Sequence, residues 1–330
     1  MSLIFIHYPY THLFFIMKSN YFPLLSFIFL ILLFSPFPLL STLSTSNHQQ
    51  ITKNPSSVSP PFDFLKPLIG THKGQSAKGI SQLKKYFSKI GFKYKDYIHN
   101  TTKPPHENDD YFDDTLELFL ISFQSYFQLK VNGLIDDQTV KQLMRPRCGV
   151  PDSGNFRDTH NNFQGKIPII SSHYTFFPGT PKWSPTKRNL TYSISPRAQI
   201  VGVNNSISRA LDLWASVSPF RFTYVSDYDR ADIKIGFRSG DPFDGPGGFL
   251  AQAFEPSDGR VYFDGDEKWA DGVKQGAFDL QTVGLHQLGH ILGLGHTTSV
   301  SSIMYPYFGD GLRKGLDQED IKGIRDLYPY

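Results

Sequence analysis

The segment Val283–Met304 reads VGLHQLGHILGLGHTTSVSSIM and contains three histidines, His286, His290 and His296. The first two are four residues apart, so on a helix both imidazoles project from one face and can bind a single metal ion. The Gly-Leu-Gly sequence at 293–295 allows a sharp turn, after which His296 can return as a third ligand. A lone pair of histidines at this spacing is more often solvated or packed than metal-bound, but the third histidine favours a zinc site.

The length and charge of the chain favour a globular protein of two domains. Its 330 residues are 39% hydrophobic, which is enough for sizeable cores. The 33 lysines and arginines against 30 aspartates and glutamates give a net charge of only +3, without the basic block that follows a nucleic-acid backbone. We therefore expect no nucleic acid among its partners.

The N-terminus is predicted to be a signal peptide over residues 1–44. An apolar run extends from Phe22 to Leu40 and is followed by small residues. Translation is expected to start at Met17, because no lysine or arginine precedes it. An uncleaved membrane anchor is the alternative, against which Pro36 and Pro38 argue. The mature protein is therefore expected to be secreted, in the extracellular matrix or cell wall, with no stable membrane anchor.

The chain contains a single cysteine, Cys148. Cysteines of secreted proteins usually pair, so a solitary thiol either has a specific role or is an inert buried residue. Three N-x-S/T triplets begin at Asn100, Asn189 and Asn204 and suit an extracellular glycoprotein, although such triplets also arise by chance.

The N-terminal half is predicted to form a small three-helix domain over residues 79–152. Residues 45–75 are rich in Ser, Pro, Thr, Asn and Lys and show no periodicity, and we expect a flexible lead-in over residues 45–78. Apolar residues then recur at helical spacing in 79–90 and in 115–127, and a third short helix is expected after Asp137. The sequence PRCGVPD closes this domain.

A second domain is expected over residues 174–330, after a polar linker at 153–173 that is a natural site of proteolytic nicking. Amphipathic helices are expected at 207–217 and 317–328, beside the helix that carries the histidines. The order of elements predicts an α+β fold. The expected strands, chosen by alternation and β-branched or aromatic content, are 190–194, 220–225, 231–237, 249–254 and 260–264.

The motifs of this chain resemble those of the matrixins, the matrix metalloproteinases, and in their compact layout the plant members. The motifs are HQLGHILGLGH with the following SIMYP, PRCGVPD at 146–152, FDGPGG at 243–248 and FDGDEKW at 263–269. The resemblance covers about Gly79 to Tyr330. It implies an autoinhibitory prodomain with a peptidoglycan-binding-like fold. It also implies a metzincin-type catalytic domain with a twisted, mostly parallel sheet and three helices, without a haemopexin-like domain.

The resemblance also implies roles for the cysteine and for a methionine. The three histidines would bind the catalytic zinc, and Cys148 would be its fourth ligand in the latent form, because a thiolate is a strong ligand for tetrahedral zinc. Met304 would form the Met-turn beneath the zinc, whereas its sequence context alone would make it a core residue. The prodomain of this chain is thus expected to bind the catalytic domain of the same chain, as a partner in cis.

Of two further metal sites of the family, the residues of one are retained in this sequence and those of the other are not. The calcium pattern is retained, with carboxylate and carbonyl oxygens as a hard cation requires, although each acidic residue alone could be part of a solvated loop. A structural zinc is predicted to be absent, because Gln252 and Tyr262 stand where the family has histidines and only Asp241 remains. The implied calcium ligands are Asp244, Gly245, Gly247, Phe249, Asp264 and Glu267.

By the resemblance, Gln287 stands at the position of the glutamate that acts as general base and acid. A glutamine cannot accept a proton, so strongly impaired hydrolysis is expected. The sequence leaves two main functions open: a secreted latent zinc endopeptidase, and a non-catalytic zinc- and peptide-binding relative that acts as a decoy or scaffold. Binding of wall polysaccharide through residues 79–145 is a third hypothesis that rests on fold analogy alone.

Overall fold

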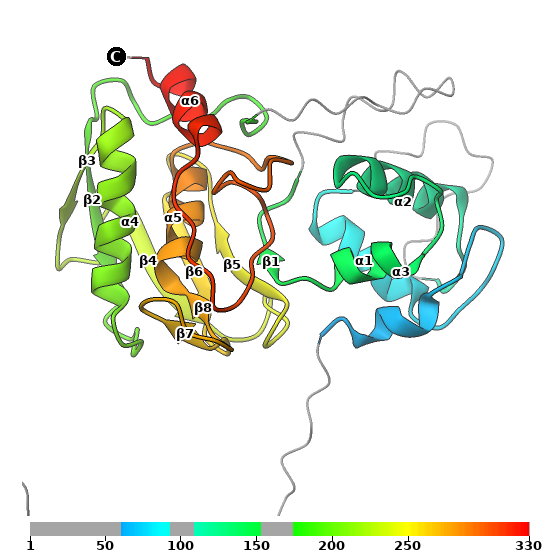
Figure 1. Cartoon of the computed structure of the whole chain (residues 1–330). Helices are drawn as coiled ribbons and strands as arrows, with labels where there is room; N and C mark the ends of the chain where they lie inside the picture. The colour runs from blue at the N-terminus through cyan, green and yellow to red at the C-terminus, as the bar shows by residue number, and fades with distance from the viewer. Residues whose placement is uncertain (1–60, 93–108, 153–173, 330) are drawn as a thin grey trace, which may run out of the picture. The chain divides into compact units, whose positions relative to one another are not determined.

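The computed structural model describes residues 61–92, 109–152 and 174–329, which belong to one compact unit (Figure 1). The predicted signal peptide, residues 45–60 of the lead-in, the linker at 153–173 and the triplet at Asn100 lie outside the described residues. Within the described ranges, no helix is long and apolar enough to cross a membrane.

Three α-helices and a short 3-10 helix form the N-terminal helical part. They are η1 (Asp63–Leu68), α1 (Ile80–Lys89), α2 (Asp114–Tyr126) and α3 (Asp137–Leu143). The carboxylates of Asp113 and Asp136 cap α2 and α3, accepting from backbone amides at 2.8 Å, which satisfies free N–H groups of the first turn. All three predicted helices are thus confirmed.

The prediction of a flexible lead-in over residues 45–78 is wrong for residues 61–78. Leu65 and Leu68 of η1 are fully buried in the core of the helical part. Ser76 pairs with Tyr111 in an antiparallel bridge, so this segment is also tied down by backbone hydrogen bonding. The apolar residues of this segment give no periodic signal, because a six-residue 3-10 helix that contains Pro67 is too short to show a repeat.

The C-terminal part is built on a mostly parallel sheet, as predicted. Its strand order is β1-β5-β6-β4-β2-β3, and only β5 and β6 pair antiparallel. β7 (Trp269–Ala270) and β8 (Phe278–Asp279) form a separate parallel pair. The strands of the main sheet are β1 (Arg147–Cys148), β2 (Asn189–Ile194), β3 (Arg221–Tyr224), β4 (Ile233–Arg238), β5 (Phe249–Ala253) and β6 (Arg260–Asp264).

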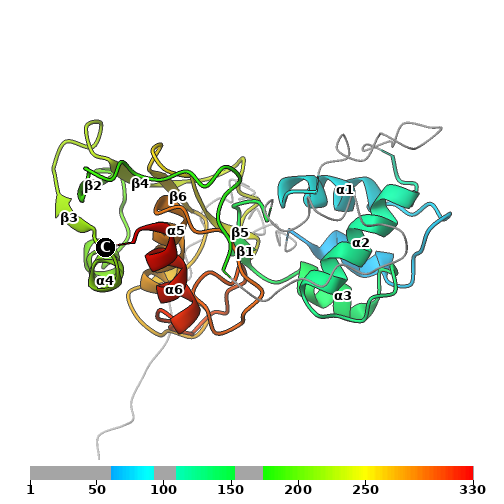
Figure 2. The same ribbon diagram turned by 90° about the horizontal axis from the view of Figure 1, so that it is seen from above.

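Three helices accompany this sheet: α4 (Val203–Val217), α5 (Leu280–Ile291) and α6 (Gln318–Leu327). Figures 1 and 2 show α4 and α5 side by side on one face of the sheet. Trp214 of α4 is fully buried, and its ring nitrogen donates to the carbonyl of Leu285 in α5 at 2.8 Å. Every residue of α5 is buried, so the site helix is held on all sides.

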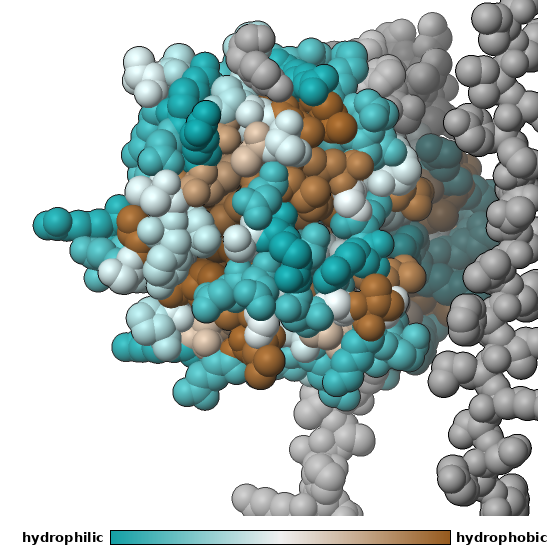
Figure 3. Space-filling view, turned by 60° about the vertical axis from the view of Figure 1, so that its left-hand side comes forward, coloured by the Kyte–Doolittle hydropathy of each residue, from teal (hydrophilic) through white to brown (hydrophobic). Residues whose placement is uncertain are grey.

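The surface is mixed in polarity on the face seen in Figure 3, where hydrophobic groups lie as separate patches between hydrophilic ones. The two described glycosylation triplets begin at exposed residues, Asn189 and Asn204. This is the exposure that a glycan would need.

Candidate metal centre

After helix α5, a turn that contains glycines folds the chain back beside the last turn of the helix. Asp279 caps the helix at its start, and its carboxylate accepts from the amide of Thr282 at 3.1 Å. Gly293 has a φ of +104°, and a Cβ there would lie 2.8 Å from the carbonyl oxygen of Pro181. Only glycine fits both conditions, and the turn carries His296 back to the helix.

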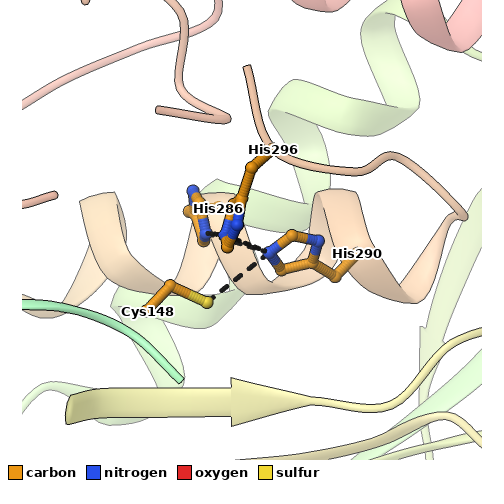
Figure 4. Close-up of side chains that lie close together, drawn as sticks. All are labelled: Cys148, His286, His290 and His296. Carbon is orange, nitrogen blue, oxygen red and sulfur yellow. Dashed lines mark hydrogen bonds between the residues drawn. The ribbon is translucent and has the colours of Figure 1, made fainter. Parts of the chain in front are cut away.

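The structure brings the three predicted histidines and Cys148 into one buried cluster (Figure 4). The Nε2 atom of His290 lies 3.0 Å from that of His286 and 3.1 Å from that of His296, and the remaining pair is 3.3 Å apart. The Sγ of Cys148 lies 3.5 Å from Nε2 of His290. The four ligand atoms all lie within 4.8 Å of one another.

The outer nitrogen of each histidine is held by an acceptor, which fixes the tautomer. His286 Nδ1 lies 2.7 Å from the carbonyl of Ile303, and His290 Nδ1 lies 2.8 Å from that of Leu294. The third outer nitrogen, on His296, faces a carboxylate. Each ring must donate from Nδ1, so each Nε2 presents a lone pair to the centre of the cluster.

Burial lowers the pKa of all three histidines, well below the usual 6.5 for His286 and His290. The rings are therefore neutral at physiological pH, and three lone pairs converge without a proton between them. A cation at the centre would satisfy all three at once. The side chains thus have the protonation state that metal ligands require.

The spacing also fits zinc. With Zn–N bonds of about 2.0–2.1 Å, the nitrogens of a tetrahedral site are roughly 3.3 Å apart, close to the separations between these histidines. Burial raises the pKa of the Cys148 thiol to about 12, so the sulfur is protonated until a bound cation displaces the proton. With Cys148 in place a bound zinc would have four protein ligands and no open position.

Met304 packs directly beneath the metal-site helix. The methionine is 1% exposed, and a Cβ on Gly289 would lie 2.4 Å from its sulfur. The buried carboxylate of Asp320 accepts from the amides of Ile303 and Met304 at 2.8 and 3.3 Å, fixing the turn that carries them. The same turn supplies the carbonyl that orients His286.

Gln287 points into the cluster from the same helix. Its side chain is fully buried, and Nε2 lies 3.2 Å from Cys148 Sγ and 3.4 Å from the carbonyl oxygen of Ala251. Its Oε1 has no hydrogen-bond partner among the described residues. The residue that the resemblance singles out is thus in contact with the sulfur.

The segment around Cys148 lies extended between two backbone strips. On one side, the amides of Arg147 and Gly149 donate to the carbonyls of Gly248 and Ala251 at 3.0 and 2.8 Å. On the other side, Cys148 donates to Pro306 at 2.8 Å, and Phe308 donates to Pro146 at 2.9 Å. The two strips together bind an extended chain along both of its edges.

Asp152 is a site residue that the sequence reading missed. One of its oxygens lies 2.5 Å from His296 Nδ1, and both accept from Arg147 Nη2 at 2.9 Å. Asp152 and Arg147 are both buried, and the adjacent charge of Arg147 helps to hold the pKa of Asp152 below its usual value against the effect of burial. Asp152 is the last residue of the PRCGVPD motif, so its place in that motif could have indicated a role at the site.

The three carboxylates of the predicted calcium site influence one another electrostatically, although among the described residues the group of side chains that could hold a metal is the histidine and cysteine cluster. Burial, together with the neighbouring negative charges, raises the pKa of Asp264 to about 6 and of Glu267 to about 7, and burial raises that of Asp244. One oxygen of Asp264 is buried without a partner among the described residues. Gly247 donates its amide to Glu267, and Phe249 donates its amide to Asp244. Such a group of oxygens fits a hard cation, which would relieve the mutual repulsion.

Two of the positions predicted to have lost a structural zinc lie opposite each other on paired strands. Gln252 and Tyr262 are register partners on β5 and β6. The guanidinium of Arg238 lies 3.8 Å from the centre of the Tyr262 ring, which is a cation–π contact. Asp241 is exposed. Neither a glutamine nor a tyrosine matches the nitrogen and sulfur donors that structural zinc prefers.

Comparison with known proteins points to one family. The matrixin family model matches residues 182–329, and the model of a putative peptidoglycan binding domain matches residues 76–143. Metalloendoproteinase 1 of Glycine max is 43% identical over 270 residues, covering 78% of this chain and 84% of that protein. Metalloendoproteinase 5-MMP of Arabidopsis thaliana is 39% identical over 303 residues, covering 83% of this chain and 80% of that protein. Matrix metalloproteinase-20 of Homo sapiens is 39% identical over 218 residues, covering 62% of this chain and 40% of that protein.

Proposed function

This chain belongs to the matrixin family of metalloendopeptidases, and on that premise we propose that it is a secreted, latent zinc endopeptidase whose hydrolytic step is strongly impaired by Gln287. Its substrates would be extended segments of extracellular proteins. The observation that carries the proposal is the convergence of three neutral histidine nitrogens on one buried point, with the Cys148 sulfur 3.5 Å from one of them.

The hydrogen bonds around Cys148 support an extended peptide as the ligand. The chain's own segment at 146–149 forms backbone hydrogen bonds along both edges, between β5 and the strip at 306–308. In detail, the segment donates to the β5 side, and it both donates and accepts on the side of residues 306–308. Backbone pairing of this kind binds peptides with little dependence on sequence, so side-chain pockets would supply the selectivity. A substrate would use the same strips once that segment has left. The segment would therefore be the inhibitor in cis, with Cys148 as its anchoring ligand.

A zinc ion held by His286, His290 and His296 would activate a water molecule and polarise the scissile carbonyl. The protein would then need a group that takes the proton and passes it to the leaving amine. Gln287 can orient a water by hydrogen bonding, but its amide accepts no proton at physiological pH. General acid–base catalysis contributes about 10² to 10⁴ in rate, so a loss of this order is expected relative to a glutamate.

Other features complete the proposal. Asp244, Asp264 and Glu267 would bind Ca²⁺ together with the backbone carbonyls of Gly245, Gly247 and Phe249, because burial of neighbouring carboxylates without a cation is unfavourable. The second zinc of the family would be absent. The predicted signal peptide and the exposed triplets support an extracellular location, in the matrix or the cell wall.

The second candidate function is a non-catalytic relative that keeps zinc and peptide binding and serves as a decoy or scaffold. We call the state in which Cys148 occupies the histidine cluster the closed form. The contact between the Gln287 amide and Cys148 favours this second function, because it gives the glutamine a role in the closed form that needs no catalysis. The two candidates differ in one measurable property, the turnover of a peptide after the N-terminal part has been removed.

The test compares protein lacking residues 1–152 with its Gln287→Glu variant on a peptide library. Slow hydrolysis that rises by about 10² to 10⁴ in the variant would support the impaired peptidase. No turnover without the glutamate, with zinc retained, would support the non-catalytic relative, and equal turnover would overturn the assigned effect of Gln287. A matched control is Gln281→Glu in the same helix, whose side chain faces Arg209 at 2.7 Å instead of the cluster.

A further inference from the structure

The contact between Gln287 and Cys148 has a defined direction. Two acceptors face one end of the amide: the sulfur at 3.2 Å and the carbonyl oxygen of Ala251 at 3.4 Å. A nitrogen at that end can donate one hydrogen to each. In the metal-bound form Cys148 is a thiolate, so an oxygen at that end would face two acceptors with no hydrogen between them, and the amide must present its nitrogen. The cost is that Oε1 remains without a partner among the described residues.

The sulfur therefore receives hydrogen bonds from two sides. The backbone amide of Val150 donates to it at 3.3 Å, in addition to the Gln287 amide. When a metal ion binds, Cys148 becomes a thiolate, and hydrogen bonds to an ionised acceptor are stronger than neutral ones. Donors around a coordinated ligand also orient it and tune its binding. Gln287 thus contributes to the closed form through the ligand it contacts.

A glutamate at position 287 would have the opposite effect. An ionised carboxylate only accepts hydrogen bonds, and it would meet the sulfur and the Ala251 carbonyl in a buried site. It would have to bind a proton, or move away, for the segment with Cys148 to stay in place. The closed form is therefore expected to be more stable with glutamine at position 287 than with glutamate.

We propose that Gln287 is a latch residue, whose side-chain amide donates to the Cys148 sulfur and makes the closed, four-ligand form the strongly favoured resting state of this protein. The inference rests on the proposed zinc site and latency, and it assigns to Gln287 a role in regulation. Gln287 acts here through Cys148, as a positioning residue. A hydrogen bond to a charged group corresponds to roughly 10- to 100-fold in an equilibrium constant.

The single cysteine of the chain makes the test direct. Full-length, zinc-loaded protein is treated with iodoacetamide at neutral pH, and alkylation of Cys148 is followed by mass. Alkylation requires the segment to leave the site, so its rate follows the population of the open form. The variants are Gln287→Glu, Gln287→Met, which keeps a similar size without a donor, and the control Gln281→Glu.

We expect alkylation to be slowest with Gln287, faster in Gln287→Met and at least about tenfold faster in Gln287→Glu. The control should match the unmodified protein. Equal or slower alkylation of both Gln287 variants would overturn the proposal, and the Met variant alone decides the donor question if the Glu variant does not fold. In cobalt-substituted protein, loss of the donor in Gln287→Met should move the sulfur-to-metal charge-transfer band to lower energy, and an unchanged band would contradict the hydrogen bond.

The readouts separate this inference from the proposed function. Zinc content, measured on the same samples, tests the metal site, whereas the ratio of alkylation rates tests the latch. Zinc with equal rates overturns only the latch. A protein that binds no zinc overturns the zinc site, and the alkylation ratio still reports whether the amide protects the sulfur. Peptide hydrolysis enters neither comparison.

Discussion

Asp152 Oδ1 lies 2.5 Å from Nδ1 of His296, and the same carboxylate is paired with the buried Arg147. The other two histidines of the cluster are oriented by backbone carbonyls of the C-terminal part. The third is therefore oriented by the segment that also carries Cys148. The closed form holds the metal site at two points, the sulfur and the outer nitrogen of His296.

The first prediction concerns Asp152→Ala. The change leaves the Arg147 guanidinium buried without its counter-charge, which typically costs about 3–5 kcal/mol of stability. The measurement is urea unfolding of zinc-loaded full-length protein, followed by fluorescence. As a control, Asp258→Ala removes the partner of the largely exposed Arg260 and should change the unfolding free energy by less than about 1 kcal/mol. Equal effects of the two changes would contradict the structural role of Asp152.

The second prediction concerns Cys148→Ser, which removes the sulfur ligand and opens the fourth position of the site. We expect zinc to remain bound by the three histidines but to exchange faster with a competing chelator, by at least about tenfold. Chelator competition with a chromophoric indicator gives the rate. An unchanged rate would show that the sulfur does not ligate the metal.

The third prediction is one zinc ion per chain after exhaustive dialysis. Gln252 and Tyr262 are neighbours on paired strands, and Arg238 covers the tyrosine ring, so the described residues at these positions provide no histidine ligand. Metal analysis by mass spectrometry measures the ratio of zinc to protein. A ratio of two would refute the loss of the structural zinc site.

The fourth prediction is a stabilisation by calcium that grows with pH. The pKa values of Asp264 and Glu267 rise from their usual 3.8 and 4.5 to about 6 and about 7 in the folded protein. In this window the folded state binds more protons than the unfolded state, so without calcium stability decreases as pH rises. Calcium replaces those protons and should raise Tm more at pH 7.5 than at pH 5. A calcium effect that is equal at both pH values, or absent, would count against the site.

The fifth prediction concerns Gly289→Ala in α5. Helix propensity alone favours alanine by about 0.8–1.0 kcal/mol. The added Cβ would instead lie 2.4 Å from the sulfur of Met304 and 3.0 Å from Trp214, and overpacking of this kind costs about 1–3 kcal/mol. We expect a lower Tm and weaker zinc retention. Gly315→Ala is the control, because nothing lies within 4 Å of that position, and a stabilised Gly289 variant would refute the packing argument.

The secondary structure was largely predictable because it depends on local pattern. Apolar spacing located α1, α2 and α4, and in α4 the apolar residues Ile207, Leu211 and Trp214 are buried. The pattern failed for η1, where the core contacts are too few to repeat. It also gave no indication that β1 adds to the edge of the sheet beside β5, since a two-residue strand has no period of its own.

The sequence by itself determined the ligand set. His286 and His290 share a helix face because the helical repeat places them there, and the glycine turn accounts for His296. Only the tertiary structure decided what surrounds those ligands: the Gln287 amide at the sulfur and the Asp152 carboxylate at His296, each across more than 130 residues of chain. Local preferences act over one or two turns, whereas these contacts depend on how residues far apart in the chain pack together. For that reason the identity of residue 287 was legible in the sequence, and its hydrogen-bond partner was not.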